Sequence, residues 1–226
     1  MKGILYGIGT GPGDPELMTL KAVRVISECG VIAVPASDID DCIAWRAAAG
    51  ACPGIEEKEI LRVPFLMGGA AEEERAARRI ENADKIAAFL DQGRDVAFLT
   101  IGDPTIYTTF GYAADILKGR GYEIVFVSGM PSFCGVSARL GTMLCSGSES
   151  LEIIPGVKKT SGVTRVYMKT EKNLPALLER LRSEEADAKI VENCCLEDER
   201  VFEDISDLPD DIGYFNIIVA KEKTNS

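Results

Sequence analysis

The sequence predicts an α/β protein built from two domains, a parallel-sheet N-terminal domain over residues 1–120 and a mixed-sheet C-terminal domain over residues 121–226. A length of 226 residues by itself allows one large domain or two small ones, and either could have a core. The first half alternates short apolar runs with longer amphipathic ones, which is the pattern of parallel strands joined by helices. After about residue 122, the expected strands follow one another more closely, which is typical of a mixed sheet.

The expected elements of the first half begin with a strand over residues 4–7 and a helix over residues 15–28. Asp14 can cap this helix, and Pro15 suits its first position. Two strands come next, over residues 31–34 and 59–64. A long charged helix follows over residues 70–92, which Gly93 stops, and then a buried parallel strand over residues 95–100.

The next expected elements are a helix over residues 105–118, a strand over 123–127 and a helix over 132–140, which is entered through turn residues. Five strands then follow, over residues 151–154, 165–168, 190–192, 200–205 and 214–220. One helix, over residues 174–183, lies among them. We expect the domain boundary near residues 119–121, because the spacing of the strands changes after it.

Charge and hydropathy exclude several classes of partner. The chain carries 25 basic and 36 acidic residues, a net charge of −11, so it repels phosphate backbones and nucleic acid is not expected as a partner. No apolar run approaches the roughly 18 residues that a membrane helix requires. The first residues enter a strand-like run without the apolar region of a signal peptide. We therefore expect a cytoplasmic protein with no membrane partner.

The cysteines and the absence of histidine limit the chemistry further. Seven cysteines make an odd count with no C-x-x-C pair, so we expect free, reduced thiols, no disulfide framework and no metal site. The adjacent Cys194 and Cys195 are interpreted as packing residues. The chain has no histidine, which excludes imidazole general bases, histidine-dependent triads and histidine-ligated metals.

The first glycine-rich turn, residues 7–15 (GIGTGPGDP), lies where a strand leads into a helix. Glycines there let a backbone approach a ligand closely. The dinucleotide spacing G-x-G-x-x-G is not met, because its third glycine position holds Pro12 or Asp14, and no G-K-[ST] of a phosphate-binding loop follows. From its residues alone, the stretch is as well interpreted as a simple turn.

A second turn, residues 99–107 (LTIGDPTIY), also connects the end of a strand to a helix. In a parallel sheet both turns lie at the same edge, where small ligands are normally held. The pair of turns therefore predicts a small-molecule site at the carboxyl ends of the strands.

These turns carry a family resemblance. The sequence resembles the class III tetrapyrrole methyltransferases in residues 7–22 (GIGTGPGDPELMTLKA), 102–107 (GDPTIY), 128–133 (SGMPSF), 167–169 (YMK), 172–174 (KNL), 208–209 (LP) and 214–215 (YF). Within that family, residues 105–110, 132–133 and 168–169 are most similar to the branch that methylates carbon 20 of precorrin-2 or cobalt-factor II in cobalamin biosynthesis.

The resemblance implies a homodimer with S-adenosyl-L-methionine in a cleft between two α/β domains and a tetrapyrrole substrate. Carried over position by position, it implies cofactor contacts from Pro12, Gly102, Asp103, Thr105, Ile106, Tyr107, Ser132, Phe133, Met168, Asn193 and Cys194. Two places depart from the family pattern, Pro131 in the third turn and the run Asn193-Cys194-Cys195.

Methyl transfer from a sulfonium is an in-line displacement that depends mainly on positioning, so a chain without histidine can perform it. Asp103 and Tyr107 are the catalytic candidates. The simpler interpretation of Asp103 is a turn and helix-cap acceptor, and that of Tyr107 is a half-buried packing residue. The substrate would carry several carboxylates, and the basic candidates to meet them are Lys21, Arg139, Lys169 and Lys172.

Four alternatives remain open from the sequence. Another member of the superfamily would methylate a different ring carbon, act in the diphthamide pathway as a diphthine synthase, or methylate ribosomal RNA, although the acidic charge argues against RNA. A non-catalytic nucleotide-binding module would bind the cofactor without turnover.

Overall fold

A computed structural model describes residues 2–66, 69–156, 164–170, 173–209 and 211–222. The chain divides into two compact units, Met1–Pro131 and Ser132–Ser226. The division therefore falls after Pro131, and not after residue 120 as the sequence predicts. The reason is the strand Glu123–Val127, which pairs with the first strand of the chain and completes the N-terminal sheet.

The first unit contains a five-stranded sheet with the order β3-β2-β4-β1-β5. Every neighbouring pair in it is parallel, as predicted. The strands, in chain order, are β1 (Ile4–Gly9), β2 (Val31–Val34), β3 (Glu59–Arg62), β4 (Val96–Thr100) and β5 (Glu123–Val127). The central strands β2 and β4 are buried at every position, which explains their continuous apolar sequences.

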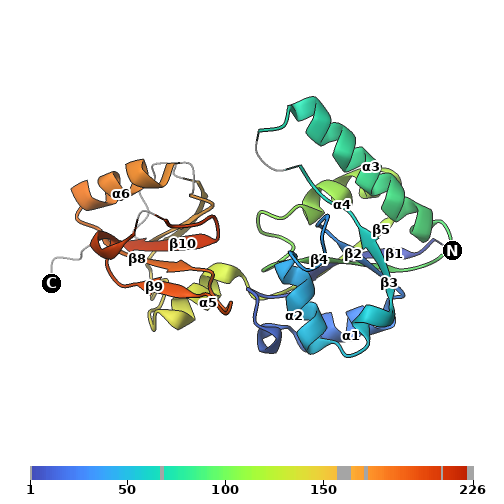
Figure 1. Cartoon of the computed structure of the whole chain (residues 1–226), viewed down its shortest axis with the longest axis horizontal. Helices are drawn as coiled ribbons and strands as arrows, with labels where there is room; N and C mark the ends of the chain where they lie inside the picture. Colours follow the sequence, from blue (N-terminus) through green and yellow to red (C-terminus); the bar gives the residue numbers. More distant parts are fainter. Residues whose placement is uncertain (1, 67–68, 157–163, 171–172, 210, 223–226) are drawn as a thin grey trace. The chain divides into compact units, whose positions relative to one another are not determined.

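Helices cover both faces of this sheet (Figure 1). They are α1 (Leu20–Glu28) and α2 (Ile43–Ala51) on one face, and α3 (Glu72–Leu90) and α4 (Phe110–Gly119) on the other. Alternate residues of β4 supply the two cores, since Leu99 packs with α1 and α2 while Phe98 packs with α3 and α4. None of the helices in the described part of the chain combines the length and apolarity that a membrane crossing requires.

Two helix starts and one whole helix differ from the prediction for local reasons. Residues Pro15–Leu17 form a separate turn of 3₁₀ helix, and α1 begins only at Leu20 because the Thr19 hydroxyl accepts from the Ala22 amide as its cap. Likewise α4 begins at Phe110, since the preceding residues form a turn. The helix α2 was not predicted. Its N-cap, Cys42, makes no capping hydrogen bond, so the usual start signal is missing.

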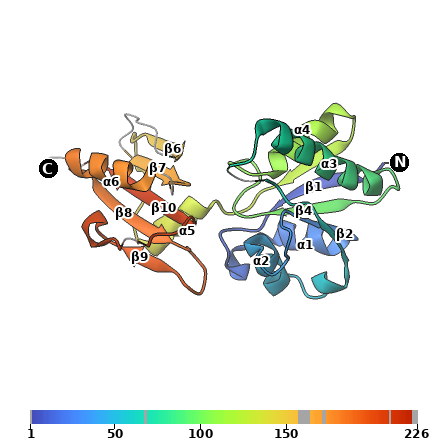
Figure 2. The same ribbon diagram turned by 45° about the horizontal axis from the view of Figure 1, so that its top comes forward.

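The second unit contains a mixed five-stranded sheet with the order β6-β7-β10-β8-β9 (Figure 2). Only β6 and β7 pair in parallel. The strands are β6 (Leu151–Pro155), β7 (Thr164–Met168), β8 (Asp187–Glu192), β9 (Arg200–Phe202) and β10 (Asn216–Lys221). The unit also contains α5 (Ser132–Arg139) and α6 (Leu174–Ser183), and the apolar face of α6 forms the main core with the sheet.

The pairing of β10 determines which loops of the second unit are neighbours. Both β7 and β8 are antiparallel to β10, so their carboxyl ends lie at the same edge of the sheet. Met168, the last residue of β7, lies opposite Ile217, and Glu192, the last of β8, lies opposite Asn216. Loops that are far apart in sequence thus meet at the start of β10.

Candidate functional site

In the first unit, three loops meet at the carboxyl edge of the parallel sheet. They follow β1, β4 and β5, and β1 lies between the other two strands. Gly9 is in register with Thr100 on one side, and Ile8 with Val127 on the other. The prediction that the two glycine-proline turns lie at one edge is confirmed, and a third loop joins them.

The first two loops are held together by backbone hydrogen bonds. The Gly102 amide donates to the Gly11 carbonyl at 2.8 Å, and the Gly11 amide donates to the Gly102 carbonyl at 3.3 Å. Both glycines have left-handed backbones, with φ of 74° at Gly11 and 72° at Gly102, which other residues adopt only with strain. The Thr10 amide and hydroxyl both donate to the Thr100 carbonyl, at 2.9 and 3.1 Å. The turns are thus one hydrogen-bonded unit.

The third loop approaches the other two so closely that side chains are excluded. A Cβ atom on Gly129 would lie 2.2 Å from the Gly102 carbonyl oxygen, and one on Gly9 would lie 2.5 Å from the Gly129 nitrogen. Such distances are well inside van der Waals contact. The glycines at these positions therefore serve the packing of one loop on another. This role could not be seen in the sequence, because the residues involved belong to different loops and meet only in the completed fold.

Asp103 connects the second loop to the third. Its side chain is buried, and its Oδ2 accepts from the Gly129 amide at 3.1 Å. Its Oδ1 accepts from the amide of Thr105 at 2.8 Å and from the hydroxyl of the same residue. Both oxygens are engaged within the protein, which agrees with the interpretation of Asp103 as a turn acceptor. Asp103 is therefore suited to position the loops.

The residues after Asp103 form a tight turn. Tyr107 has a left-handed backbone with φ of 48°, an uncommon conformation for a residue with a side chain, and its side chain is 45% exposed. Thr105 is exposed and Ile106 is half-buried. The Thr108 hydroxyl donates to the Pro104 carbonyl at 3.1 Å and closes the turn. Left-handed residues of this kind are concentrated at functional sites.

The donors and acceptors of the three loops suit a cationic ligand. Residues 10–14, 101–109 and 128–131 contain no lysine or arginine, whereas they contain the carboxylates Asp14 and Asp103. Carbonyl dipoles and carboxylates favour a positive charge nearby, and a phosphate would find no cationic partner. The residues present therefore fit the sulfonium of S-adenosyl-L-methionine better than they fit a dinucleotide. Pro12, the other candidate of this region, is buried in the first loop.

The remaining candidates lie in the second unit. Met168 ends β7 and Asn193 directly follows β8, so the structure brings them to the same sheet edge, with the buried Cys194 next along the chain. Ser132 and Phe133 are the first residues of α5. The candidates thus form two groups, one in each unit.

Asn193 is held tightly in its position. Its φ is 50°, its amide donates to the Phe215 carbonyl at 2.8 Å, and its side-chain nitrogen donates to Asp198 Oδ2 at 2.7 Å. The bend after β8 is thus connected to the segment that leads into β10.

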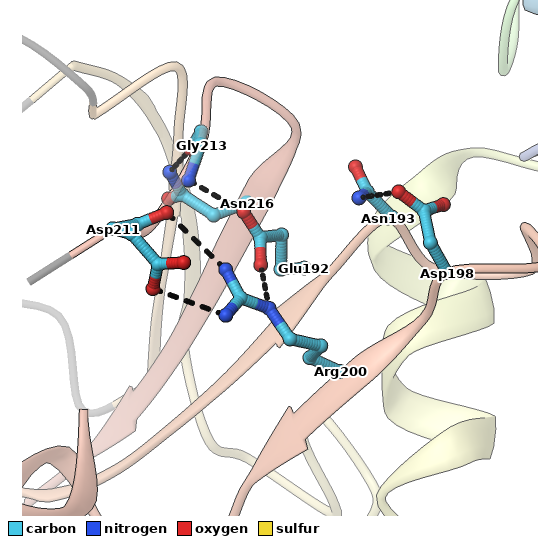
Figure 3. Close-up of polar contacts among 7 residues, drawn as sticks. All are labelled: Glu192, Asn193, Asp198, Arg200, Asp211, Gly213 and Asn216. Carbon is cyan, nitrogen blue, oxygen red and sulfur yellow. Dashed lines mark hydrogen bonds and ion pairs between the residues drawn. The ribbon is translucent and has the colours of Figure 1, made fainter. Parts of the chain in front are cut away.

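A buried polar network at this edge was not predicted (Figure 3). Glu192 is only 4% exposed, and its Oε2 accepts from Arg200 Nε at 2.5 Å while its Oε1 accepts from the Gly213 amide. The Arg200 guanidinium also donates to Asp211 Oδ1 at 3.1 Å. These acceptors raise the pKa of Arg200 above its ordinary value. In the sequence, Glu192 is visible as an ionisable residue at the end of an apolar strand. The sequence does not show that Arg200 is its partner.

Asn216 extends this network to the end of β7. It is 2% exposed, its Oδ1 accepts from the Thr170 hydroxyl at 2.6 Å, and its Nδ2 donates to the Gly213 carbonyl at 2.6 Å. The loop before β10 is thereby connected to the ends of both flanking strands. Buried polar groups that are fully paired in this way give a loop one defined conformation.

The four basic candidates for substrate carboxylates differ in their surroundings. Arg139 forms an ion pair with Glu199, so its charge is already partnered. Lys21 is exposed in α1, and Lys169 is exposed directly after β7 with a left-handed φ of 59°. Lys172 lies outside the described residues.

Comparison with known proteins agrees with the resemblance seen in the sequence. The probable cobalt-precorrin-2 C(20)-methyltransferase of Methanocaldococcus jannaschii is 34% identical over 204 residues, which cover 87% of this chain and 85% of that protein. The precorrin-2 C(20)-methyltransferase of a Sinorhizobium species is 29% identical over 194 residues, or 77% of this chain and 76% of that protein.

The fold is shared with solved structures. Uroporphyrin-III C-methyltransferase from Thermus thermophilus, solved in complex with S-adenosyl homocysteine, has a TM-score of 0.68 at 20% identity, and the match covers 97% of this chain and 98% of that one. Residues 4–209 match the family described as Tetrapyrrole (Corrin/Porphyrin) Methylases. The chain belongs to this tetrapyrrole methylase family.

Proposed function

We propose that this chain transfers the methyl group of S-adenosyl-L-methionine to carbon 20 of precorrin-2 or cobalt-factor II in cobalamin biosynthesis, leaving S-adenosyl-L-homocysteine. Two relatives similar over most of the chain bear the name of a C(20)-methyltransferase acting on precorrin-2 or its cobalt form, and this supports the choice of ring carbon. The solved relative in complex with S-adenosyl homocysteine supports the cofactor.

The observation that carries the proposal is the junction of the three loops at the edge of the parallel sheet. Asp103 and the glycines around it join these loops through short contacts, and no basic side chain lies within them. This arrangement offers carbonyls, amides and hydroxyls in fixed positions, which suits a neutral nucleoside that carries a sulfonium.

When bound, the cofactor supplies an electrophilic methyl group on its sulfonium. The residues of this chain then act by positioning, because in-line transfer needs the acceptor carbon and the methyl group held in line at short range. Correct placement can contribute on the order of 7 to 11 kcal/mol to such a reaction. Asp103, with both oxygens engaged, keeps the loops in place, and no residue has to act as a strong base.

The proposed cofactor contacts come from both units. From the first unit they are Pro12, Gly102, Asp103, Thr105, Ile106 and Tyr107, and from the second they are Ser132, Phe133, Met168, Asn193 and Cys194. In the first unit, Thr105 and Tyr107 are exposed residues, and the Thr105 hydroxyl donates to Asp103 Oδ1. Lys21, Lys169 and Lys172 remain proposed partners for substrate carboxylates, and Arg139 forms an ion pair with Glu199.

We also propose that the protein works as a homodimer, as the family resemblance implies, and that it works in the cytoplasm. Light scattering on the purified protein should then give twice the chain mass of 24.4 kDa. A mass equal to that of one chain would reject the dimer and leave the activity to be judged separately.

The activity is tested by anaerobic incubation with S-adenosyl-L-methionine and, in separate reactions, precorrin-2 and cobalt-factor II. We expect the mass of one methyl group to be added and fragmentation to place it at carbon 20. Reactions without cofactor or without protein are the controls. A methyl group on another ring carbon, or cofactor binding with no transfer to either substrate, would reject the proposal.

A further inference from the structure

Two adjacent cysteines and a glutamate form a compact cluster in the loop after β8. The Sγ atoms of Cys194 and Cys195 are 3.6 Å apart. One ligand atom each from Cys194, Cys195 and Glu199 lies within 4.8 Å of the others. We call these three residues the dithiol–carboxylate cluster. Cys194 is buried, and the other two are half-buried.

The backbone explains why both thiols point to one side. Consecutive side chains of an extended segment point in opposite directions, so adjacent cysteines normally diverge. Here Asn193 and Cys195 both have left-handed backbones, with φ of 50° and 65°. This uncommon pair of conformations on either side of Cys194 turns the two thiols toward each other. Such conformations persist only where the surrounding structure holds them.

Hydrogen bonds within the loop hold this conformation. The Cys195 amide donates to Glu199 Oε2 at 2.9 Å, which brings the carboxylate to the thiols. The Leu196 amide donates to the Asn193 carbonyl at 2.9 Å, and the Glu199 amide donates to the Leu196 carbonyl at 3.2 Å. The three potential ligands are therefore arranged by the protein itself.

The distance between the sulfurs suits a shared metal ion. A tetrahedral zinc ion with Zn–S bonds of about 2.3 Å places two thiolate sulfurs about 3.8 Å apart, close to the 3.6 Å observed. A disulfide would need about 2.05 Å. The two sulfurs are thus already near the geometry in which both contact one ion.

The charges around the cluster also suit a divalent cation. Two thiolates and one carboxylate carry three negative charges, and a divalent ion supplies two positive ones. The third positive charge comes from Arg139, whose Nε is paired with Glu199 Oε1. Buried charges are tolerated when they are paired, so a neutral assembly of this kind meets that requirement.

We propose that Cys194, Cys195 and Glu199 bind one soft divalent cation of the zinc class, with a fourth position open to water. Binding replaces the two thiol protons, which pass to solvent, and forms two metal–thiolate bonds and one metal–carboxylate bond. The sequence alone predicts no metal site, because C-x-x-C spacing is absent and the approach of Glu199 to the thiols is visible only in the fold. The proposal does not depend on the methylation reaction.

The test is a titration of the full chain with Co²⁺ in the presence of a phosphine reductant and without substrate. Co²⁺ reports thiolate ligands by a near-ultraviolet charge-transfer band and a tetrahedral site by its visible bands. We expect one ion per chain, and we expect added Zn²⁺ to displace it. Cys195→Ser removes one of the two thiolate ligands, so at saturation it should lower the charge-transfer band by about half and weaken binding by at least about tenfold. Cys145→Ser, at an exposed cysteine outside the cluster, is the matched control and should bind as the parent does.

Glu199→Gln separates the two kinds of ligand. This variant should keep the thiolate band but bind Co²⁺ more weakly. Circular dichroism on each variant confirms that it is folded. Absence of the band in the reduced parent protein, or an equal band in Cys195→Ser, would overturn the proposal. A reduced protein that takes up no metal but forms a Cys194–Cys195 disulfide on oxidation would overturn it too, and would identify a redox pair.

Discussion

At the scale of single residues, the most informative position is Asp103. Its sequence context, Gly-Asp-Pro, is that of a common turn, and the turn is what its Oδ1 stabilises through Thr105. Its Oδ2 accepts from the Gly129 amide of a different loop, and the local sequence does not reveal this interaction. One carboxylate thereby holds two neighbouring loops in a fixed relation.

Replacement of Asp103 by asparagine tests this interpretation. An amide has one acceptor oxygen in place of two, so either the Gly129 or the Thr105 amide loses its partner while it stays partly buried. We expect the free energy of unfolding to fall by about 1 to 3 kcal/mol, with weaker cofactor binding by calorimetry. Asp14→Asn is the control for the loss of stability, because its single bond to the Glu16 amide needs only one oxygen. Unchanged stability and affinity in Asp103→Asn would show that the carboxylate does not join the loops.

The cysteines differ in reactivity for a reason that is also local. Burial raises the pKa of the Cys29 thiol to about 12. A raised pKa favours the protonated form, so at pH 8 only on the order of one molecule in ten thousand carries the Cys29 thiolate. We expect Cys29 to resist alkylation by iodoacetamide in the folded protein, while the exposed Cys145 reacts readily. Mass mapping of labelled peptides measures both, and equal labelling of the two sites would contradict the burial of Cys29.

At the scale of elements, the carboxyl edges of the two sheets determine where the candidate residues lie. In the first unit, glycines allow three loops to pack on one another. In the second, the paired polar groups of Glu192, Arg200 and Asn216 hold the loops around β10. Close approach of the backbones holds the loops at the first edge, and buried charged groups hold them at the second.

Gly129→Ala isolates the close approach in the first unit. Its added Cβ would lie 2.2 Å from the Gly102 oxygen, a backbone atom that cannot rotate away. We expect a loss of about 1 to 3 kcal/mol in the free energy of unfolding, measured by urea denaturation. Gly111→Ala is the matched control, since it lies in α4 with nothing within 4 Å, and it should stabilise the protein by about 0.5 to 1 kcal/mol. Equal stability of the two variants would refute the packing of these loops.

Arg200→Leu tests the buried pair in the second unit. The change leaves the Glu192 carboxylate, 4% exposed, without its cationic partner. Since Arg200 itself is 38% exposed, water can replace part of the interaction, and we expect a loss of about 2 kcal/mol in stability, below the cost at a fully buried pair. Lys189→Leu breaks the ion pair with Glu203, whose side chain is 63% exposed, and should cost less than about 1 kcal/mol. Similar losses in the two variants would show that burial adds nothing at Glu192.

At the scale of the whole molecule, the sequence predicted the order of strands and helices apart from α2, because apolar periodicity and turn residues are local signals. It misplaced the division between the units, since the pairing of β5 with β1 joins residues more than a hundred positions apart. The same limit applies to the site. The two glycine-proline turns were recognisable, whereas the contact of Gly129 with Asp103 and the pairing of Glu192 with Arg200 depend on the completed fold.

The central claim is that the three joined loops of the first unit hold the cofactor. Calorimetric titration of S-adenosyl-L-homocysteine into the parent protein, Gly129→Ala and Gly111→Ala tests it most directly. We predict one ligand per chain for the parent and for Gly111→Ala, and affinity lowered by at least about tenfold in Gly129→Ala, corresponding to about 1.4 kcal/mol. A folded Gly129→Ala protein that binds the ligand as tightly as the parent would contradict the claim.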